Sequence, residues 1–171
     1  HILQDVERCL GSYVFLWGQK QETTPTWFGL FLENGRALEG VEVMRYLWSR
    51  QDPESPTPWL SHLQINGSRP EDSLGVEPGS DLEISYHVIH RGNPATELRW
   101  KLVPESSDKR IGGDAEMRPD PLDVDIRAPA PGEAALKAPE EPGAYRIFLY
   151  LQASGNKAAT ANFPFRVQPK R

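Results

Sequence analysis

Cysteine is nearly absent from this chain of 171 residues, since Cys9 is the only one. A disulfide within the chain needs two cysteines, so the hydrophobic core must hold the fold, and Cys9 is expected to be a small apolar residue and not a nucleophile. Basic residues are scattered as well, and the net charge is -5 with a pI near 5.4. Phosphate binding needs a clustered basic face, so we expect no nucleic-acid partner.

Long apolar runs are missing too. No stretch approaches the ~20 residues that span a membrane, and no basic segment followed by an apolar one marks a signal peptide, so we predict no membrane span. The first residue is His1 and not Met, as in a mature or excised piece of a longer protein. His62, His87 and His90 lack the close paired spacing of a structural zinc site, so we expect no metal and no cofactor.

Composition changes sharply near residue 50. Residues 51–59 are rich in proline, which disfavours helix and is typical of an extended linker. Before this stretch lie an apolar run, a polar turn and a helical pattern, and after it come short runs separated by Pro, Gly and Asp. We therefore predict a strand-loop-helix segment over residues 1–50, a linker over 51–59 and a β-sandwich over 60–171.

The third part has the period-two pattern of strands with one buried face. Apolar residues share one parity in four runs: 82–88, 98–102, 145–151 and 159–167. Shorter strands are expected over three further ranges: 63–65, 122–126 and 134–137. About seven strands in ~110 residues is typical of an immunoglobulin-like or fibronectin-like sandwich.

Details of the last two runs agree with a sandwich. Gly155 and Asn156 lie between them and suit a tight hairpin with positive φ angles. Pro164 lacks a backbone donor, so the last strand should lie at an edge or bulge there. The aromatic residues mostly have the parity of the core, which leaves Phe148 and Tyr150 as outward candidates.

Two runs resemble bacterial immunoglobulin-like modules of the polycystic-kidney-disease and cadherin-like type: EISYHVIHRGNPATELRWKLVPES and GAYRIFLYLQASGNKAATANFPFRV. The resemblance implies that Trp100 is the core tryptophan. Many relatives bind calcium through aspartates in the intervening turns. Other residues stand at these places here: His90, Arg91, Asn93, Ser154 and Asn156. Because Ca²⁺ needs several oxygen ligands, preferably charged, we expect no calcium site.

The first part has a different pattern. The apolar run SYVFLW at 12–17 is typical of a strand buried on both faces. After Gly35, apolar residues recur every three or four positions, which predicts an amphipathic helix. The apolar positions are Leu38, Val41, Met44, Leu47 and Trp48. A single strand and helix cannot bury their own apolar faces, so this unit should need a partner.

This unit resembles the eighth and last βα unit of a (β/α)₈ glycoside hydrolase-like barrel, of the broad group that includes glycoside hydrolase family two. The matching features are Trp17 at the strand end, the loop over 18–22, Thr26 with Trp27, the helix from Val41 to Trp48 and the proline-rich exit. The resemblance implies the C-terminal part of a bacterial carbohydrate-active enzyme that is secreted or lies in the periplasm or cell envelope. Its implied partner is polysaccharide or the missing barrel portion.

The same resemblance implies sugar contacts but no catalytic residue. Glycoside hydrolysis needs two carboxyl groups, about 5 Å apart for retention and farther apart for inversion, at the carboxyl ends of barrel strands. The family takes these from the fourth and seventh strands, which this chain lacks, so we expect the isolated chain to be inactive. The carbohydrate-binding candidates are Trp17, Gln19, Lys20, Glu22 and Trp27. The alternative is that Trp17 and Trp27 are core residues and that Lys20 and Glu22 belong to an ordinary solvated turn.

Two functional hypotheses follow. In the first, the chain is a non-catalytic C-terminal portion of a glycoside hydrolase-like enzyme, and the sandwich is an accessory, spacer or polysaccharide-contacting module. In the second, it is a secreted or cell-surface immunoglobulin-like module for protein interaction or structure, with no carbohydrate role. They differ over residues 1–50, whose apolar faces stay exposed in the first case and are buried within the chain in the second.

Overall fold

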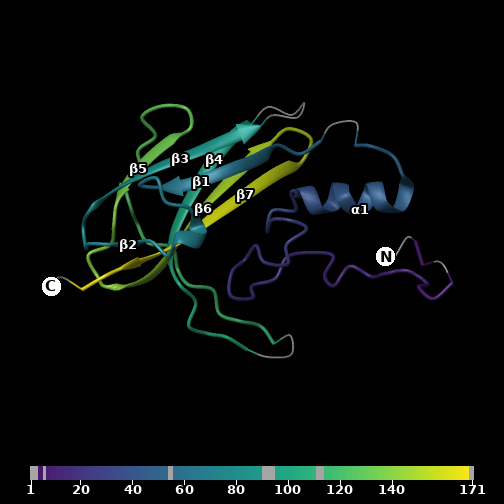
Figure 1. Cartoon of the computed structure of the whole chain (residues 1–171), viewed down its shortest axis with the longest axis horizontal. Coiled ribbons are helices and arrows are strands. Elements are labelled where there is room, and N and C mark those ends of the chain that lie inside the picture. Colours follow the sequence, from purple (N-terminus) through teal and green to yellow (C-terminus); the bar gives the residue numbers. More distant parts are fainter. Residues whose placement is uncertain (1–3, 6, 54–55, 90–94, 111–113, 170–171) are drawn as a thin grey trace.

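The computed structural model describes residues 4–5, 7–53, 56–89, 95–110 and 114–169. Figure 1 shows a β-sandwich with an α-helix beyond one end of it. Among the places that the calcium-binding relatives use, His90, Arg91 and Asn93 lie outside the described residues.

The described residues form seven strands in two sheets. In the first sheet the order is β1 (Trp59–Ile65), β3 (Asp81–Ile89) and β5 (Glu133–Lys137). In the second sheet the order is β2 (Gly75–Val76), β7 (Lys157–Val167), β6 (Gly143–Ala153) and β4 (Ala95–Pro104). All neighbouring strands are antiparallel except β2 and β7, which are parallel.

This arrangement is an immunoglobulin-like sandwich, because β1, β3 and β5 form one sheet and β4, β6 and β7 the other. The predicted fold class, a mostly β immunoglobulin-like sandwich, is therefore confirmed. A short 3₁₀ helix, η1 (Pro70–Asp72), precedes β2. Strand β2 was not expected, since two residues are too short to show a period.

The core lies between the two sheets and follows the predicted parity. Its most deeply buried apolar residues include Ile65, Leu82, Leu102, Leu136, Ile147, Leu149 and Phe163. Trp100 is half-buried at the border of this core, where its ring meets Tyr86 edge to face at 5.5 Å. The implied role of Trp100 as a core tryptophan therefore agrees with its packing.

Two predictions about the last strands are confirmed. Gly155 and Asn156 have φ angles of 66° and 58°, in the left-handed region that a tight hairpin uses. Pro164 lies in β7, and β2 pairs with this strand only at Arg166 and Val167. At Pro164 the strand β7 therefore has a neighbouring strand on one side, namely β6, as an edge position requires.

The strand expected over 122–126 is wrong. These residues form irregular chain, although Leu122, Val124 and Ile126 pack against the core. Their alternation therefore marks the buried side of an irregular segment, which bonds to β4 through the Leu122 N–H and the Leu102 carbonyl at 2.8 Å. Asp123 and Asp125 between them, and Pro121 before them, disfavour strand formation.

The first segment differs most from expectation. Its helix, α1 (Glu39–Ser49), is the one predicted from the apolar spacing, and it ends at Arg50 in the left-handed conformation. The strand predicted over 12–17 is wrong, because this run forms no strand and its Tyr13 side chain is fully exposed. A strand needs a neighbour for its backbone groups and its apolar side chains, and the described part of the sandwich provides none here.

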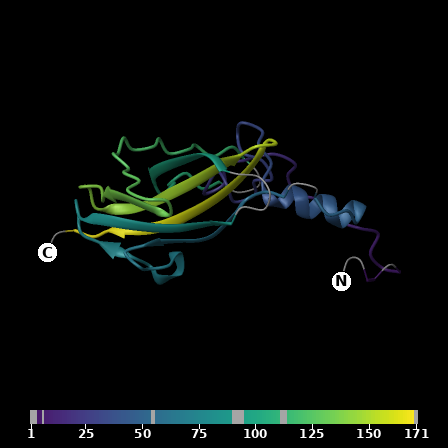
Figure 2. The ribbon, with the colours of Figure 1, turned by 90° about the horizontal axis from the view of Figure 1, so that it is seen from above.

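The first segment is attached to the sandwich at the β6–β7 hairpin. The backbone of Ala37 accepts a hydrogen bond from Ala158 and donates one to Asn156, each at 2.9 Å. The Arg36 guanidinium donates to the carbonyl of Ala153 at 2.8 Å. Figures 1 and 2 show α1 extending from this end of the sandwich, away from the C-terminus.

A buried carboxylate completes the attachment. Glu42 of α1 is 6% exposed, and it accepts hydrogen bonds from the Thr57 backbone N–H at 2.9 Å and from the Thr57 hydroxyl at 3.1 Å. It also forms an ion pair with Lys157 at the start of β7. Because a buried charge is stable only when paired and hydrogen-bonded, this cluster joins the helix, the chain before β1 and the sandwich.

Candidate functional site

Aromatic side chains of the first segment lie outside the core. Trp17 stacks on Trp48 of α1, with ring centroids 5.7 Å apart at 28°, and meets Phe31 edge to face at 5.4 Å. Despite these contacts Trp17 is 54% exposed, and Trp27 is 69% exposed. We call the exposed aromatic residues of this segment the aromatic surface: Tyr13, Phe15, Trp17, Trp27, Tyr46 and Trp48. Large exposed apolar areas on one segment are typical of an interaction site.

The loop that follows Trp17 folds back on itself. The Gly18 carbonyl accepts a hydrogen bond from the Leu30 N–H at 3.1 Å, and the Gln19 amide donates to the Pro25 carbonyl at 3.1 Å. Lys20 forms an ion pair with Glu22 at 2.7 Å. These bonds hold residues of the loop over 18–30 to one another.

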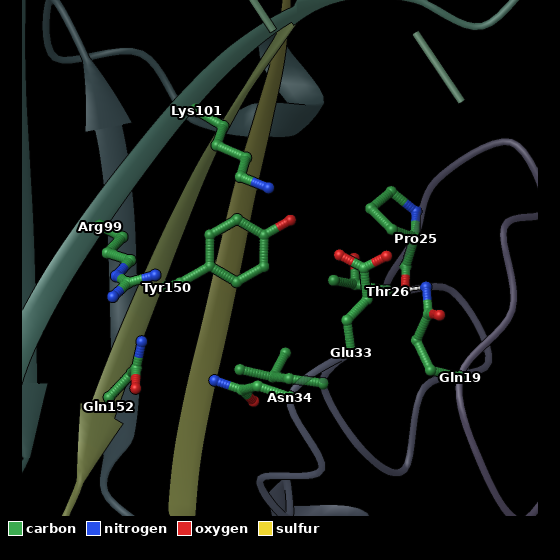
Figure 3. Close-up of a pocket in the computed structure, with 10 residues that line it drawn as sticks. Gln19, Pro25, Thr26, Glu33, Asn34, Arg99, Lys101, Tyr150 and Gln152 are labelled. Carbon is green, nitrogen blue, oxygen red and sulfur yellow. Dashed lines mark hydrogen bonds between the residues drawn. The ribbon is translucent and has the colours of Figure 1, made fainter. Parts of the chain in front are cut away.

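A cleft of about 150 Å³ lies between this loop and the outer face of the second sheet. We call it the loop–sheet cleft, and Figure 3 shows its two walls. One wall carries polar side chains of the first segment: Gln19, Thr26, Glu33 and Asn34. The other carries outward side chains of β4 and β6: Arg99, Lys101, Tyr150 and Gln152. The outward parity of Tyr150 agrees with the prediction.

Lys101 is the cation of this cleft that no described carboxylate neutralises. Its ammonium lies 5.7 Å from the centroid of the Tyr150 ring, within cation–π range. Arg99 is paired with Glu97 at 2.6 Å. Glu33, which also faces the cleft, is paired with Arg118.

A second, smaller cavity of about 40 Å³ opens beside the cleft and shares Pro25, Lys101 and Tyr150 with it. Gln21 lines this cavity, is 8% exposed, and neither polar atom of its amide has a hydrogen-bond partner in the described part of the chain. Phe148 lies on the same outer face but is buried. The predicted outward parity of Phe148 is therefore correct, but its ring is not open to solvent, and Gln21 and Pro119 line the same cavity.

Burial raises the pKa of Tyr150 to about 12; Arg118 opposes this rise and Glu33 adds to it. Because the unfolded chain releases this proton near the ordinary value of 10.0, Tyr150 supports the fold below that pH. We expect this stability to be lost as the pH rises from 10.0 through about 12. Burial also raises the pKa of Tyr145, so ultraviolet titration of the phenols should show a late transition that Tyr150→Phe reduces.

Tyr13→Phe is the matched control for this titration, because the Tyr13 ring is fully exposed. It should leave the late transition in place. A late transition of undiminished size in Tyr150→Phe would contradict the assignment to the cleft.

The predicted carbohydrate contacts fall in three places. Trp17 and Trp27 lie on the aromatic surface, Gln19 lines the loop–sheet cleft, and Lys20 and Glu22 pair with each other. Their contact with carbohydrate remains a prediction. Sequence reasoning missed Lys101 and Gln21, because the alternation in β4 shows only that Lys101 faces outward. No local signal shows that the loop over 18–30 lies above it.

Within the described ranges no group of three or more His, Cys, Asp or Glu side chains is placed to hold a metal ion. No helix in this part of the chain is long and apolar enough to cross a membrane.

No protein family and no curated protein matches the sequence. Solved structures match at low similarity. The copper resistance protein PcoC from Escherichia coli has 15% identity and a TM-score of 0.38, over 66% of this chain and 99% of that chain. Murine CRIg has 12% identity and a TM-score of 0.36, over 67% of this chain and 98% of that chain.

A third structure is a nucleoside hydrolase-related hypothetical protein from Saccharophagus degradans that is associated with carbohydrate metabolism. It has 17% identity and a TM-score of 0.38, over 74% of this chain and 29% of that chain.

Proposed function

We propose that the chain is a non-catalytic C-terminal portion of a carbohydrate-active enzyme of the glycoside hydrolase type. The immunoglobulin-like sandwich is its accessory module, and the aromatic surface contacts polysaccharide or the remaining barrel. The observation that carries this proposal is the exposure of Trp17, Trp27 and Trp48 on one short segment. The two hypotheses drawn from the sequence differ in whether these side chains are covered.

Exposure of this kind is unfavourable for a chain without a partner. Each apolar Å² left in water forgoes ~25 cal/mol of stabilisation, and tryptophan has the largest area to bury. The sandwich covers polar groups of the segment, such as Glu42, and leaves its indole rings exposed. The stacked pair of Trp17 and Trp48 also suits a sugar, because the apolar C–H face of a pyranose packs on an aromatic plane.

A protein-interaction module with no carbohydrate role is the second candidate. The hydrogen bonds of Ala37 to the β6–β7 hairpin and the buried cluster at Glu42 favour it. They make the first segment an integral part of the sandwich unit. In that case the aromatic surface would bind a protein and no polysaccharide.

Affinity gel electrophoresis of the whole chain against a series of neutral and acidic polysaccharides tests the proposal. We expect at least one polysaccharide to retard the wild-type chain. Trp17→Ala and Trp27→Ala should weaken this binding about tenfold or more, as the loss of a contact worth about 1.4 kcal/mol would. Circular dichroism shows that the variants fold.

Trp59→Ala is the matched control, because Trp59 is a partly exposed tryptophan of the first sheet. It should bind as the wild type does. If no polysaccharide retards the folded wild-type chain, the polysaccharide contact is overturned and the protein-interaction candidate takes its place. If Trp59→Ala weakens binding as much as the other two variants, the site does not lie on the aromatic surface.

A further inference from the structure

The side chain of Gln21 has an unusual environment. It is more than nine-tenths buried, and neither its amide nitrogen nor its amide oxygen has a partner among the described residues. Buried polar groups are nearly always hydrogen-bonded, so an amide with both ends unpaired points to a group that fills the site. The cavity that it lines is about 40 Å³, room for a water or a hydroxyl group.

The cavity adjoins the loop–sheet cleft, since Pro25, Lys101 and Tyr150 line both. The cleft is about 150 Å³, below the ~300–1,000 Å³ of pockets for drug-sized ligands, so it holds one ring-sized group. Its walls offer amide groups of Gln19 and Asn34 and the hydroxyl of Thr26 (Figure 3). A ring with several hydroxyl groups matches this lining.

The charges of the cleft favour an anion. Arg99 is paired with Glu97, and the carboxylate of Glu33 is paired with Arg118. Lys101 lies over the Tyr150 ring and has no carboxylate partner in the described part of the chain. A compact ammonium that lines a small polar cleft is a suitable partner for one carboxylate.

We propose that the loop–sheet cleft and the adjoining cavity form a subsite for one residue of an acidic sugar, a hexuronate. Its carboxylate pairs with the ammonium of Lys101, and one of its hydroxyl groups enters the cavity and bonds to the amide of Gln21. Its ring lies against Tyr150. This subsite rests on the proposed function, since it names the class of polysaccharide that the chain contacts.

Amide NMR titration of the whole chain with galacturonate and with galactose tests the subsite, because the two sugars differ in the carboxylate. We expect galacturonate to shift amides of β4, β6 and the loop over 18–30, and galactose to bind about tenfold or more weakly. Lys101→Met should remove the preference for the uronate. Lys137→Met is the matched control, since Lys137 lies exposed on the first sheet and pairs with Asp81; it should keep the preference.

The variant Gln21→Leu distinguishes two roles of the Gln21 amide, which could bond either to a sugar hydroxyl or to a buried water. We expect this variant to be as stable as the wild type without sugar and to bind galacturonate about tenfold more weakly. Unchanged binding would mean that a buried water only occupies the cavity, and would overturn the role of Gln21.

Equal binding of galacturonate and galactose, or an unaltered preference in Lys101→Met, would overturn the subsite. If gel retardation still depends on Trp17 and Trp27, the proposed function stands without this subsite. If no polysaccharide retards the chain either, both proposals fail.

Discussion

Replacing Phe163 by alanine is expected to lower the free energy of unfolding by about 3–5 kcal/mol. Phe163 lies in β7 opposite Ile147 of β6, is fully buried, and belongs to the core between the two sheets. Removing its ring takes away a large buried apolar surface and leaves a cavity that the close-packed strands cannot fill. Urea unfolding followed by circular dichroism measures the change.

Phe15→Ala is the matched control for this prediction. Its ring is 74% exposed and contacts Phe28 at a centroid distance of 5.0 Å. The same chemical change there should alter the free energy of unfolding by no more than about 0.5 kcal/mol. A cost for Phe15→Ala as large as that for Phe163→Ala would mean that the first segment is packed within the chain.

Replacing Glu42 by alanine is expected to cost about 3 kcal/mol. Removing one partner of a buried ion pair costs about 3–5 kcal/mol. We expect the lower end of this range, because the Lys157 side chain is 20% exposed and water can partly solvate its ammonium. The change leaves the ammonium of Lys157 without its carboxylate and the Thr57 N–H without its acceptor. Since this cluster joins α1 to the sandwich, hydrogen exchange of the α1 amides should speed up more than exchange in β6.

Asp81→Ala is the control for the loss of an ion pair. Asp81 and Lys137 pair at 3.0 Å with both side chains 67% exposed, and exposed pairs contribute about 0–1 kcal/mol. Urea unfolding should therefore separate the two variants clearly. Similar costs for Glu42→Ala and Asp81→Ala would contradict the structural role of the buried cluster.

The sandwich was predictable because most of its strands show one face to the core. In β3, Leu82, Ile84 and Tyr86 alternate with polar residues at the two-residue period of a strand, so the sequence pattern predicts the backbone conformation. The helix α1 was predictable for the same reason, with a different period. In β3 the sequence pattern and the buried face coincide, whereas in α1 the buried residue is Glu42 and Trp48 of the apolar stripe is exposed.

The run over residues 12–17 shows where this reasoning fails. A continuous apolar stretch has no period, and whether it forms a strand depends on a neighbour that the run itself does not specify. The candidate site could be predicted only in part, for a similar reason. Gln19 could be proposed from its loop, whereas the contact between Gln21 and the sheet at Lys101 and Phe148 arises only when distant segments meet.

The outer edge of β7 has a consequence for self-association. Ala37 pairs with Lys157 at one end of this edge, β2 pairs with Arg166 and Val167 at the other, and Pro164 between them has no N–H to offer. An open strand edge is a template for adding strands of another molecule, and natural proteins block such edges by covering them or by placing proline there. Both devices protect β7, so fibril growth by strand addition would have to begin at a different edge of the sandwich.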